Sequence, residues 1–252
     1  MADEHILTDG VVRLGSEYVN WYLVADDSGV TIVDTGLPGY RPQLDRGLSL
    51  LGRSPDDLRA VVLTHGDADH TGVASKLAEE WAELPIHIHP DDRRLVQGKQ
   101  KNTEESQARL VYRPQIIRLL GHFVRNGAGL RPPRVDSTAG LIVGETLDVP
   151  GGPSVIGTPG HTDGHVGFHF PKHGALFVGD SLCTWNPGDN KRGPQLMRPA
   201  FNVSNTQALE SLSAYEGIEA GLLLPGHGEP WTEGVDAALA GARATAAGLD
   251  PA

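Results

Sequence analysis

Apolar segments typical of buried strands end four times in a histidine or aspartate that is flanked by glycine or threonine. These residues are His65, His161, Asp180 and His227. Because the carboxyl ends of strands in one sheet meet at one edge, we expect these side chains to lie together. The flanking glycines allow the backbone to turn sharply beside a bound ion. One such residue is usually structural, but the recurrence predicts a metal site at a sheet edge.

The densest part of this pattern is the stretch 63–72, which reads LTHGDADHTG. It places four side chains that bind metals within six positions, namely His65, Asp67, Asp69 and His70. The apolar run 60–63 predicts a strand before it, and an i, i+4, i+8 pattern over 71–81 predicts a helix after it. Zinc, iron and manganese accept imidazole nitrogen and carboxylate oxygen. The alternative is a polar turn that caps the helix through Asp69 or Thr71. The ligands supplied by the three other stretches favour the metal site.

The bulk composition favours an ordinary globular protein and excludes several functions. The 252 residues are 39% hydrophobic, which suits one large α/β domain over residues 1–252. The single cysteine, Cys183, rules out a disulfide framework and thiolate zinc sites. The net charge of -11 without a basic run disfavours a nucleic-acid partner. The N-terminus lacks the apolar core of a signal peptide, and no run reaches the roughly 18 apolar residues of a membrane span. We therefore expect a cytoplasmic protein that acts on a small molecule, in an oligomeric state that the sequence does not indicate.

The remaining patterns predict an alternation of strands and helices around these motifs. Strands are expected at 11–14, 19–24, 30–33, 85–90, 141–143, 146–149, 154–157, 166–170, 175–178 and 221–224. Helices are expected at 40–51, 205–215 and 232–247, and a loop at 184–203. The segment 91–134 is interpreted as a helical insertion, which is either a lid over the site or an outer helix pair.

Three further polar residues have two interpretations each. Asp34 directly follows an apolar strand and is either a helix cap or a group that orients metal ligands. His87 and His89 share one face of a strand, so the pair could chelate a metal, but ordinary strand histidines are the favoured interpretation.

The order of these motifs resembles the metallo-β-lactamase fold superfamily. That family carries His-x-His-x-Asp-His, then a separate His, a Gly-Asp and a late Gly-His. Here the corresponding stretches are 65–70, Thr158-Pro159-Gly160-His161, Gly179-Asp180 and Gly226-His227, and Asp34-Thr35-Gly36 resembles the first motif of the family. The resemblance covers nearly the whole chain. It is specific for the fold and the metal site and says little about the substrate.

This resemblance implies a four-layer αββα sandwich with two divalent metal ions at one edge. It implies three sets of ligands: His65, Asp67 and His161 for the first ion, Asp69, His70 and His227 for the second, and Asp180 as the bridge. Asp69 and Asp180 are expected to be catalytic. Zinc is the expected metal, but Asp67 replaces the usual histidine, and this oxygen ligand extends the choice to manganese or iron. His165 is expected outside the ligand set, as an orienting or packing residue.

The function implied by the resemblance is hydrolysis of an ester, lactone, thioester or lactam by a hydroxide that bridges the metals. Under this mechanism Ser181 is a turn residue and Cys183 a packing residue. The Thr-Pro-Gly-His-Thr-x-Gly-His form resembles the glyoxalase II and lactonase-like branches, although the short stretch after His227 leaves no room for the helical substrate domain of glyoxalase II. The alternatives are a di-iron redox or oxygen-handling protein and a phosphodiesterase, and the acidic charge disfavours a nuclease.

Overall fold

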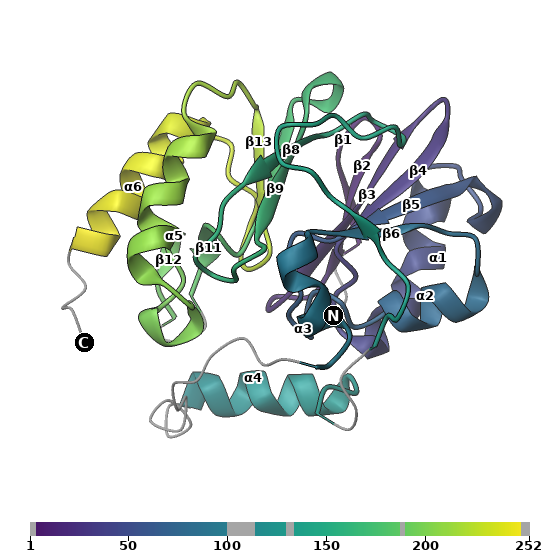
Figure 1. The fold of residues 1–252 in the computed structure, drawn as a ribbon, viewed down its shortest axis with the longest axis horizontal. Helices are drawn as coiled ribbons and strands as arrows, with labels where there is room; N and C mark the ends of the chain where they lie inside the picture. Colours follow the sequence, from purple (N-terminus) through teal and green to yellow (C-terminus); the bar gives the residue numbers. More distant parts are fainter. Residues whose placement is uncertain (1–3, 100–113, 130–133, 187–189, 248–252) are drawn as a thin grey trace.

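The chain folds into two β-sheets that lie face to face, each covered by helices on its outer side (Figure 1). The structure, a computed structural model, describes residues 4–99, 114–129, 134–186 and 190–247. The layers follow the order helix, sheet, sheet, helix. This arrangement confirms the predicted four-layer αββα sandwich.

The first sheet contains seven strands in the order in which they occur along the chain. They are β1 (His5–Thr8), β2 (Val11–Gly15), β3 (Asn20–Asp26), β4 (Gly29–Val33), β5 (Leu58–Val62), β6 (Ile86–Ile88) and β7 (Ala139–Gly140). The strands β1 to β4 are antiparallel neighbours, whereas β4 to β7 run parallel. The helices α1 (Arg41–Leu50) and α2 (Ala74–Glu80) cover the outer face of this sheet. Because β5 belongs to the parallel half, its carboxyl end presents the 63–72 stretch at the sheet edge.

The second sheet contains four strands in the order β13-β10-β9-β8. Their bounds are β8 (Ser154–Gly157), β9 (Val166–Phe170), β10 (Ala175–Gly179) and β13 (Leu222–Pro225). The helices α5 (Asn205–Ser211) and α6 (Val235–Ala247) cover its outer face (Figure 1). Since β10 and β13 are parallel neighbours, the residues that follow them, Asp180 and His227, leave the sheet side by side.

The strand β3 shows how the sequence builds two apolar layers at once. Trp21 and Leu23 point toward α1 and α2, whereas Tyr22 and Val24 point toward the second sheet. This alternation follows from the two-residue period of a strand. A third apolar layer, which includes Leu176 from β10, lies between the second sheet and α6. The sheets are therefore packed on both faces, which gives the turns at their edge a rigid base.

Three local predictions were wrong. The stretches 141–143 and 146–149 are not strands, because Ile142 and Val143 are exposed and Thr146 forms only an isolated bridge to Ser154. The predicted loop 184–203 contains a strand, β12 (Arg192–Gln195), which pairs with β11 (Cys183–Trp185). This hairpin depends on pairing across a long connection, which no local apolar pattern indicates.

The predicted insertion begins with two short helices and continues in a longer one. The short ones are η3 (Pro90–Asp92) and α3 (Arg93–Val96), and the longer one is α4 (Pro114–Arg125). Residues 100–113 and 130–133 of the predicted insertion lie outside the described residues. Figure 1 shows α4 along one edge of the sandwich. Its function as a lid stays a prediction. None of the helices in the described ranges is long and apolar enough to cross a membrane.

Candidate metal centre

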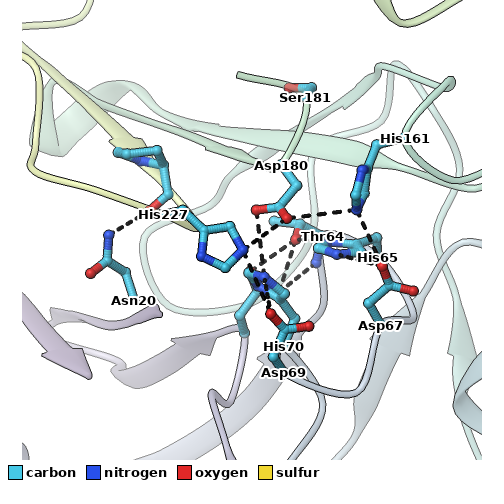
Figure 2. A network of polar contacts seen from close by, with 12 residues as sticks. Asn20, Thr64, His65, Asp67, Asp69, His70, His161, Asp180, Ser181 and His227 are labelled. Atoms are coloured by element: carbon cyan, nitrogen blue, oxygen red, sulfur yellow. Dashed lines mark hydrogen bonds and ion pairs between the residues drawn. The ribbon is translucent and has the colours of Figure 1, made fainter. Parts of the chain in front are cut away.

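Turns from both sheets bring the seven predicted ligands into one cluster (Figure 2). The 65–70 turn follows β5 in the first sheet. His161, Asp180 and His227 follow β8, β10 and β13 in the second sheet. The ends of these four strands therefore converge, as the sequence pattern predicted.

The first group of ligand atoms comes from His65, His161 and Asp180, and these atoms all lie within 4.8 Å of one another. Nε2 of His161 is 3.6 Å from Oδ2 of Asp180. The Oδ2 atom of Asp67 is 3.2 Å from Nε2 of His161 and 3.8 Å from Nε2 of His65. The side chain of Asp67 is 23% exposed, so its carboxylate borders this group from the solvent side.

The second group comes from Asp69, His70 and His227, whose ligand atoms also lie within 4.8 Å of one another. Asp180 reaches this group as well. Its Oδ1 is 3.5 Å from Nε2 of His70, and its Oδ2 is 3.1 Å from Nε2 of His227. Figure 2 shows the Asp180 carboxylate between His161 and His227. One buried carboxylate thus contacts both groups.

The Nδ1 atom of each histidine in the two groups has a hydrogen-bond partner outside the cluster. The pairs are His65 with Thr64 Oγ1 at 2.9 Å, His70 with Asp34 Oδ2 at 3.1 Å, His161 with Asn202 Oδ1 at 3.1 Å and His227 with the Tyr18 carbonyl at 2.5 Å. Carboxylate, amide and carbonyl oxygens accept, so Nδ1 carries the proton and the Nε2 lone pair is left for a ligand. This is the arrangement that metal-binding histidines require.

Asp34 fixes two parts of the 63–72 stretch at once. Its Oδ1 accepts from the Thr64 backbone N–H at 2.8 Å, and its Oδ2 accepts from His70 Nδ1. The hydroxyl of Thr64 donates to the same carboxylate, so it accepts from His65. Asp34 has a φ of 57°, which is uncommon for a residue with a side chain. Of its two interpretations, the structure supports the one in which it orients metal ligands.

The donor atoms of the cluster fit divalent metal ions. Among the described residues, the buried atoms His65 Nε2, His70 Nε2 and Asp180 Oδ1 have no hydrogen-bond partner, whereas buried polar atoms in proteins normally have one. A Cβ placed on Gly226 would lie 2.2 Å from Asp180 Oδ1 and 2.5 Å from His70 Cε1, so only glycine allows this approach. Nitrogen and oxygen donors without sulfur suit zinc, manganese or iron.

The charges of the cluster attract cations. Burial lowers the pKa of His70, but Asp180 and Asp69 outweigh burial and raise this pKa to about 10. Burial also lowers the pKa of His161, but Asp67 and Asp180 raise it to about 9. Burial raises the pKa of Asp180, yet the histidines around it hold that pKa well below its ordinary value. Divalent ions would compete with protons for the same nitrogens.

His165 lies behind the cluster, as expected for an orienting residue. Its Nε2 accepts from the Asp180 backbone N–H at 3.0 Å, and its Nδ1 faces Thr158 Oγ1 at 2.9 Å. Burial lowers the pKa of His165 to about 3, so the ring is neutral. Ser181 donates its hydroxyl to the Val178 carbonyl, which agrees with a turn residue.

Other orienting residues were missed in the sequence. Asn202 orients His161, and the carbonyl of Tyr18 orients His227. Asn20 donates to the carbonyls of Pro225 and Gly228, on either side of the His227 turn. These residues belong to no recognisable motif, so no local signal pointed to them.

His87 and His89 belong to neither ligand group. His87 lies within β6, and Nδ1 of His89 accepts from the Asp91 backbone N–H at 3.4 Å. The favoured interpretation, an ordinary strand histidine, agrees with the placement of His87, whereas His89 lies beyond the strand and caps η3.

The fold is that of a known family. Residues 14–227 match the family model described as "Metallo-beta-lactamase superfamily", and the chain belongs to this family. The probable metallo-hydrolase YflN of Bacillus subtilis (strain 168) is 26% identical over 239 residues, which cover 88% of this chain and 85% of YflN.

Two further comparisons concern the activity and the metal of relatives. A hydroxyacylglutathione hydrolase of Xylella fastidiosa (strain M23) is 32% identical over 194 residues, which cover 76% of this chain and 52% of that protein. The chain thus spans about half the length of that relative. The crystal structure of TTHA1623 in a di-iron-bound form is 25% identical, with a TM-score of 0.62, and the match covers 94% of this chain and 98% of that chain.

Proposed function

We propose that this chain is a metal-dependent hydrolase that uses two divalent ions to cleave a small-molecule ester-type bond, with a thioester as the first candidate. The observation that carries the proposal is the position of Asp180, which contacts ligand atoms of both groups. A site for a single ion would not need a buried carboxylate between two sets of imidazole nitrogens.

The ligand roles follow the two groups. We assign the first ion to His65, Asp67 and His161 and the second to Asp69, His70 and His227, with Asp180 shared. When bound, two such ions supply a water whose pKa falls from 15.7 toward about 7 and a Lewis acid for the substrate carbonyl. The three carboxylates in this set offset most of the charge of two divalent ions, and the neutral imidazoles add none.

The protein holds the Asp180 carboxylate in place and provides a side chain, Asp69, that accepts the proton of the attacking water. Asp180 is only 3% exposed and is held by His165 through its backbone, so its carboxylate keeps one position. The side chain of Asp69 is 19% exposed, and burial raises its pKa. We therefore assign Asp69 the role of accepting a proton from the attacking water and releasing it toward the leaving group.

An apolar cluster beside His227 is the proposed contact for the substrate. Trp185 lies 6.5 Å from the His227 ring, measured between ring centroids, and it packs against Ile116 and Leu119 of α4 with Tyr18 beside them. Trp185, Ile116 and Leu119 are only 5–8% exposed, so an apolar acyl or thiol group would contact them only when α4 moves aside. This placement would also give α4 an influence on substrate choice, in line with the lid prediction for 91–134.

A thioester is favoured over other substrates because a relative is named for such a reaction. The hydroxyacylglutathione hydrolase that matches 76% of this chain cleaves, by its name, an acylglutathione. Zinc is the first candidate metal. A di-iron redox or oxygen-handling role is the second candidate function, and it is favoured by the carboxylate of Asp67 and by the di-iron form of TTHA1623.

The test uses protein stripped with a chelator and then reloaded with zinc, manganese or ferrous iron. An S-acylglutathione, a lactone, an activated ester, a β-lactam and a phosphodiester are offered to each form. We expect hydrolysis of the thioester that is absent in the stripped protein and returns with two ions per chain. A reloaded protein that hydrolyses none of the five but consumes oxygen when it holds iron would contradict the proposal in favour of the redox role.

A further inference from the structure

Asp92, a buried carboxylate outside the ligand set, lies between two of the ligand turns. It is 0% exposed and ends the short helix η3. Its Oδ2 accepts from the Gly66 backbone N–H at 2.8 Å and from the Thr162 hydroxyl at 2.7 Å. Its Oδ1 accepts from the Gly164 backbone N–H at 2.8 Å. One side chain therefore joins two separate loops.

The two loops belong to different sheets and carry ligands of the first ion. Gly66 lies between His65 and Asp67 in the turn after β5 of the first sheet. Thr162 and Gly164 follow His161 in the loop between β8 and β9 of the second sheet. The hydrogen bonds of Asp92 span 26, 70 and 72 residues of sequence, so they connect parts of the chain that no local structure holds together.

Gly66 and Gly164 have no side chain, and this lets their loops pack closely against the segment that contains Asp92. A Cβ on Gly164 would lie 2.7 Å from the backbone N of Asp92 and 2.8 Å from its Oδ1. A Cβ on Gly66 would lie 2.6 Å from Cβ of Leu95 and 3.1 Å from the Asp92 carbonyl oxygen. Neither glycine adopts a positive φ, so the reason for glycine is space and not backbone conformation. Both ligand loops are thus fitted closely against the segment 92–95.

The three hydrogen bonds account for the burial of this charge. The three donors to Asp92, two backbone N–H groups and one hydroxyl, are neutral. A buried carboxylate is costly unless hydrogen bonds satisfy it, and bonds to an ionised acceptor are short and strong. Asparagine would place an N–H group against at least one of these donors, so a neutral substitute cannot keep all three bonds.

We propose that Asp92 is a positioning residue that sets the spacing between the His65 turn and the His161 loop, and thereby the ligand geometry of the first ion. The inference rests on the proposed metal centre. It also gives the start of the 91–134 insertion a role in that centre, since Asp92 and Leu95 belong to its first turns.

The test compares Asp92→Asn with Asp91→Asn, a change at the neighbouring residue, whose side chain is 64% exposed. Zinc affinity is measured by competition with a chromogenic chelator, cobalt(II) spectra report ligand geometry, and chemical unfolding reports the stability of the metal-free protein. We expect Asp92→Asn to weaken the first ion by about 10–100-fold, the range for loss of an orienting partner. We also expect it to change the cobalt spectrum, whereas Asp91→Asn behaves as the wild type.

If Asp92→Asn does not fold, a second pair of variants tests the same proposal. Thr162→Val removes one donor to Asp92 with little change in volume, and Thr162→Ser keeps the hydroxyl. We expect zinc affinity to fall by about 10-fold in the valine variant and to recover in the serine variant.

Different results would contradict the proposed metal centre and the proposed role of Asp92. If the wild type itself binds no ions, the metal centre is wrong. If the wild type binds two ions and the Asp92→Asn and Thr162→Val variants keep its affinity and cobalt spectrum, only the role of Asp92 is wrong. A loss of unfolding free energy alone, with affinity and spectrum unchanged, would likewise make Asp92 a purely structural residue.

Discussion

Asp180→Asn is expected to lower kcat/KM by on the order of 10²–10³-fold and to weaken the binding of the second ion. The carboxylate oxygens lie 3.1 Å from His227 Nε2, 3.5 Å from His70 Nε2 and 3.6 Å from His161 Nε2, so this side chain contacts both groups of ligand atoms. Asparagine keeps the shape but removes the negative charge that both ions would share. Steady-state kinetics and metal content after dialysis measure the two effects.

The matched control is Asp163→Asn, on the exposed part of the loop between His161 and His165. This variant should keep wild-type kinetics and two ions. Near-normal turnover by Asp180→Asn with both ions retained would overturn the assignment of Asp180 as the shared ligand. Loss of one ion in the Asp163→Asn variant as well would show that the loss is not specific to the shared carboxylate.

Asp67→Ala is expected to weaken the first ion by more than the roughly 10–100-fold that loss of an orienting partner costs. Its Oδ2 lies 3.2 Å from His161 Nε2 and 3.8 Å from His65 Nε2, on the solvent side of the first group. Removing it would leave two imidazoles and the shared Asp180 for that ion. Chelator competition on the zinc-loaded protein measures the loss.

The companion variant Asp67→His tests the chemistry of the oxygen ligand. A carboxylate lowers the Lewis acidity of its ion relative to imidazole and favours ions that prefer oxygen. The histidine variant should therefore shift metal preference toward zinc and move the acidic limb of the profile of kcat/KM against pH to lower pH. An Asp67→Ala protein that keeps both ions and the wild-type profile would show that Asp67 is only a turn residue.

The ligand cluster was predictable because its signal is local. Each ligand follows an apolar strand, and a strand end fixes where the next side chain lies, as for Asp180 after β10. The fold followed from the same order of motifs. The strand predictions failed at 141–149, where exposed Ile142 and Val143 gave an apolar pattern without a partner strand.

The orienting residues were not predictable because their partners are distant in sequence. The Tyr18 carbonyl and His227 are 209 residues apart, and Asn202 and His161 are 41 apart. Asp92 lies in a polar segment, Pro90-Asp91-Asp92, where nothing separates it from the exposed Asp91. Only the packing of the two sheets shows which of these two carboxylates is buried against the ligand loops.

The most direct test of the account is an anomalous X-ray diffraction map of zinc-loaded crystals, recorded on both sides of the zinc absorption edge. The account predicts two peaks, one bounded by His65 and His161 and the other by His70 and His227, with Asp180 in contact with both. A single peak, or two peaks of which either lies away from Asp180, would contradict the proposed two-ion centre.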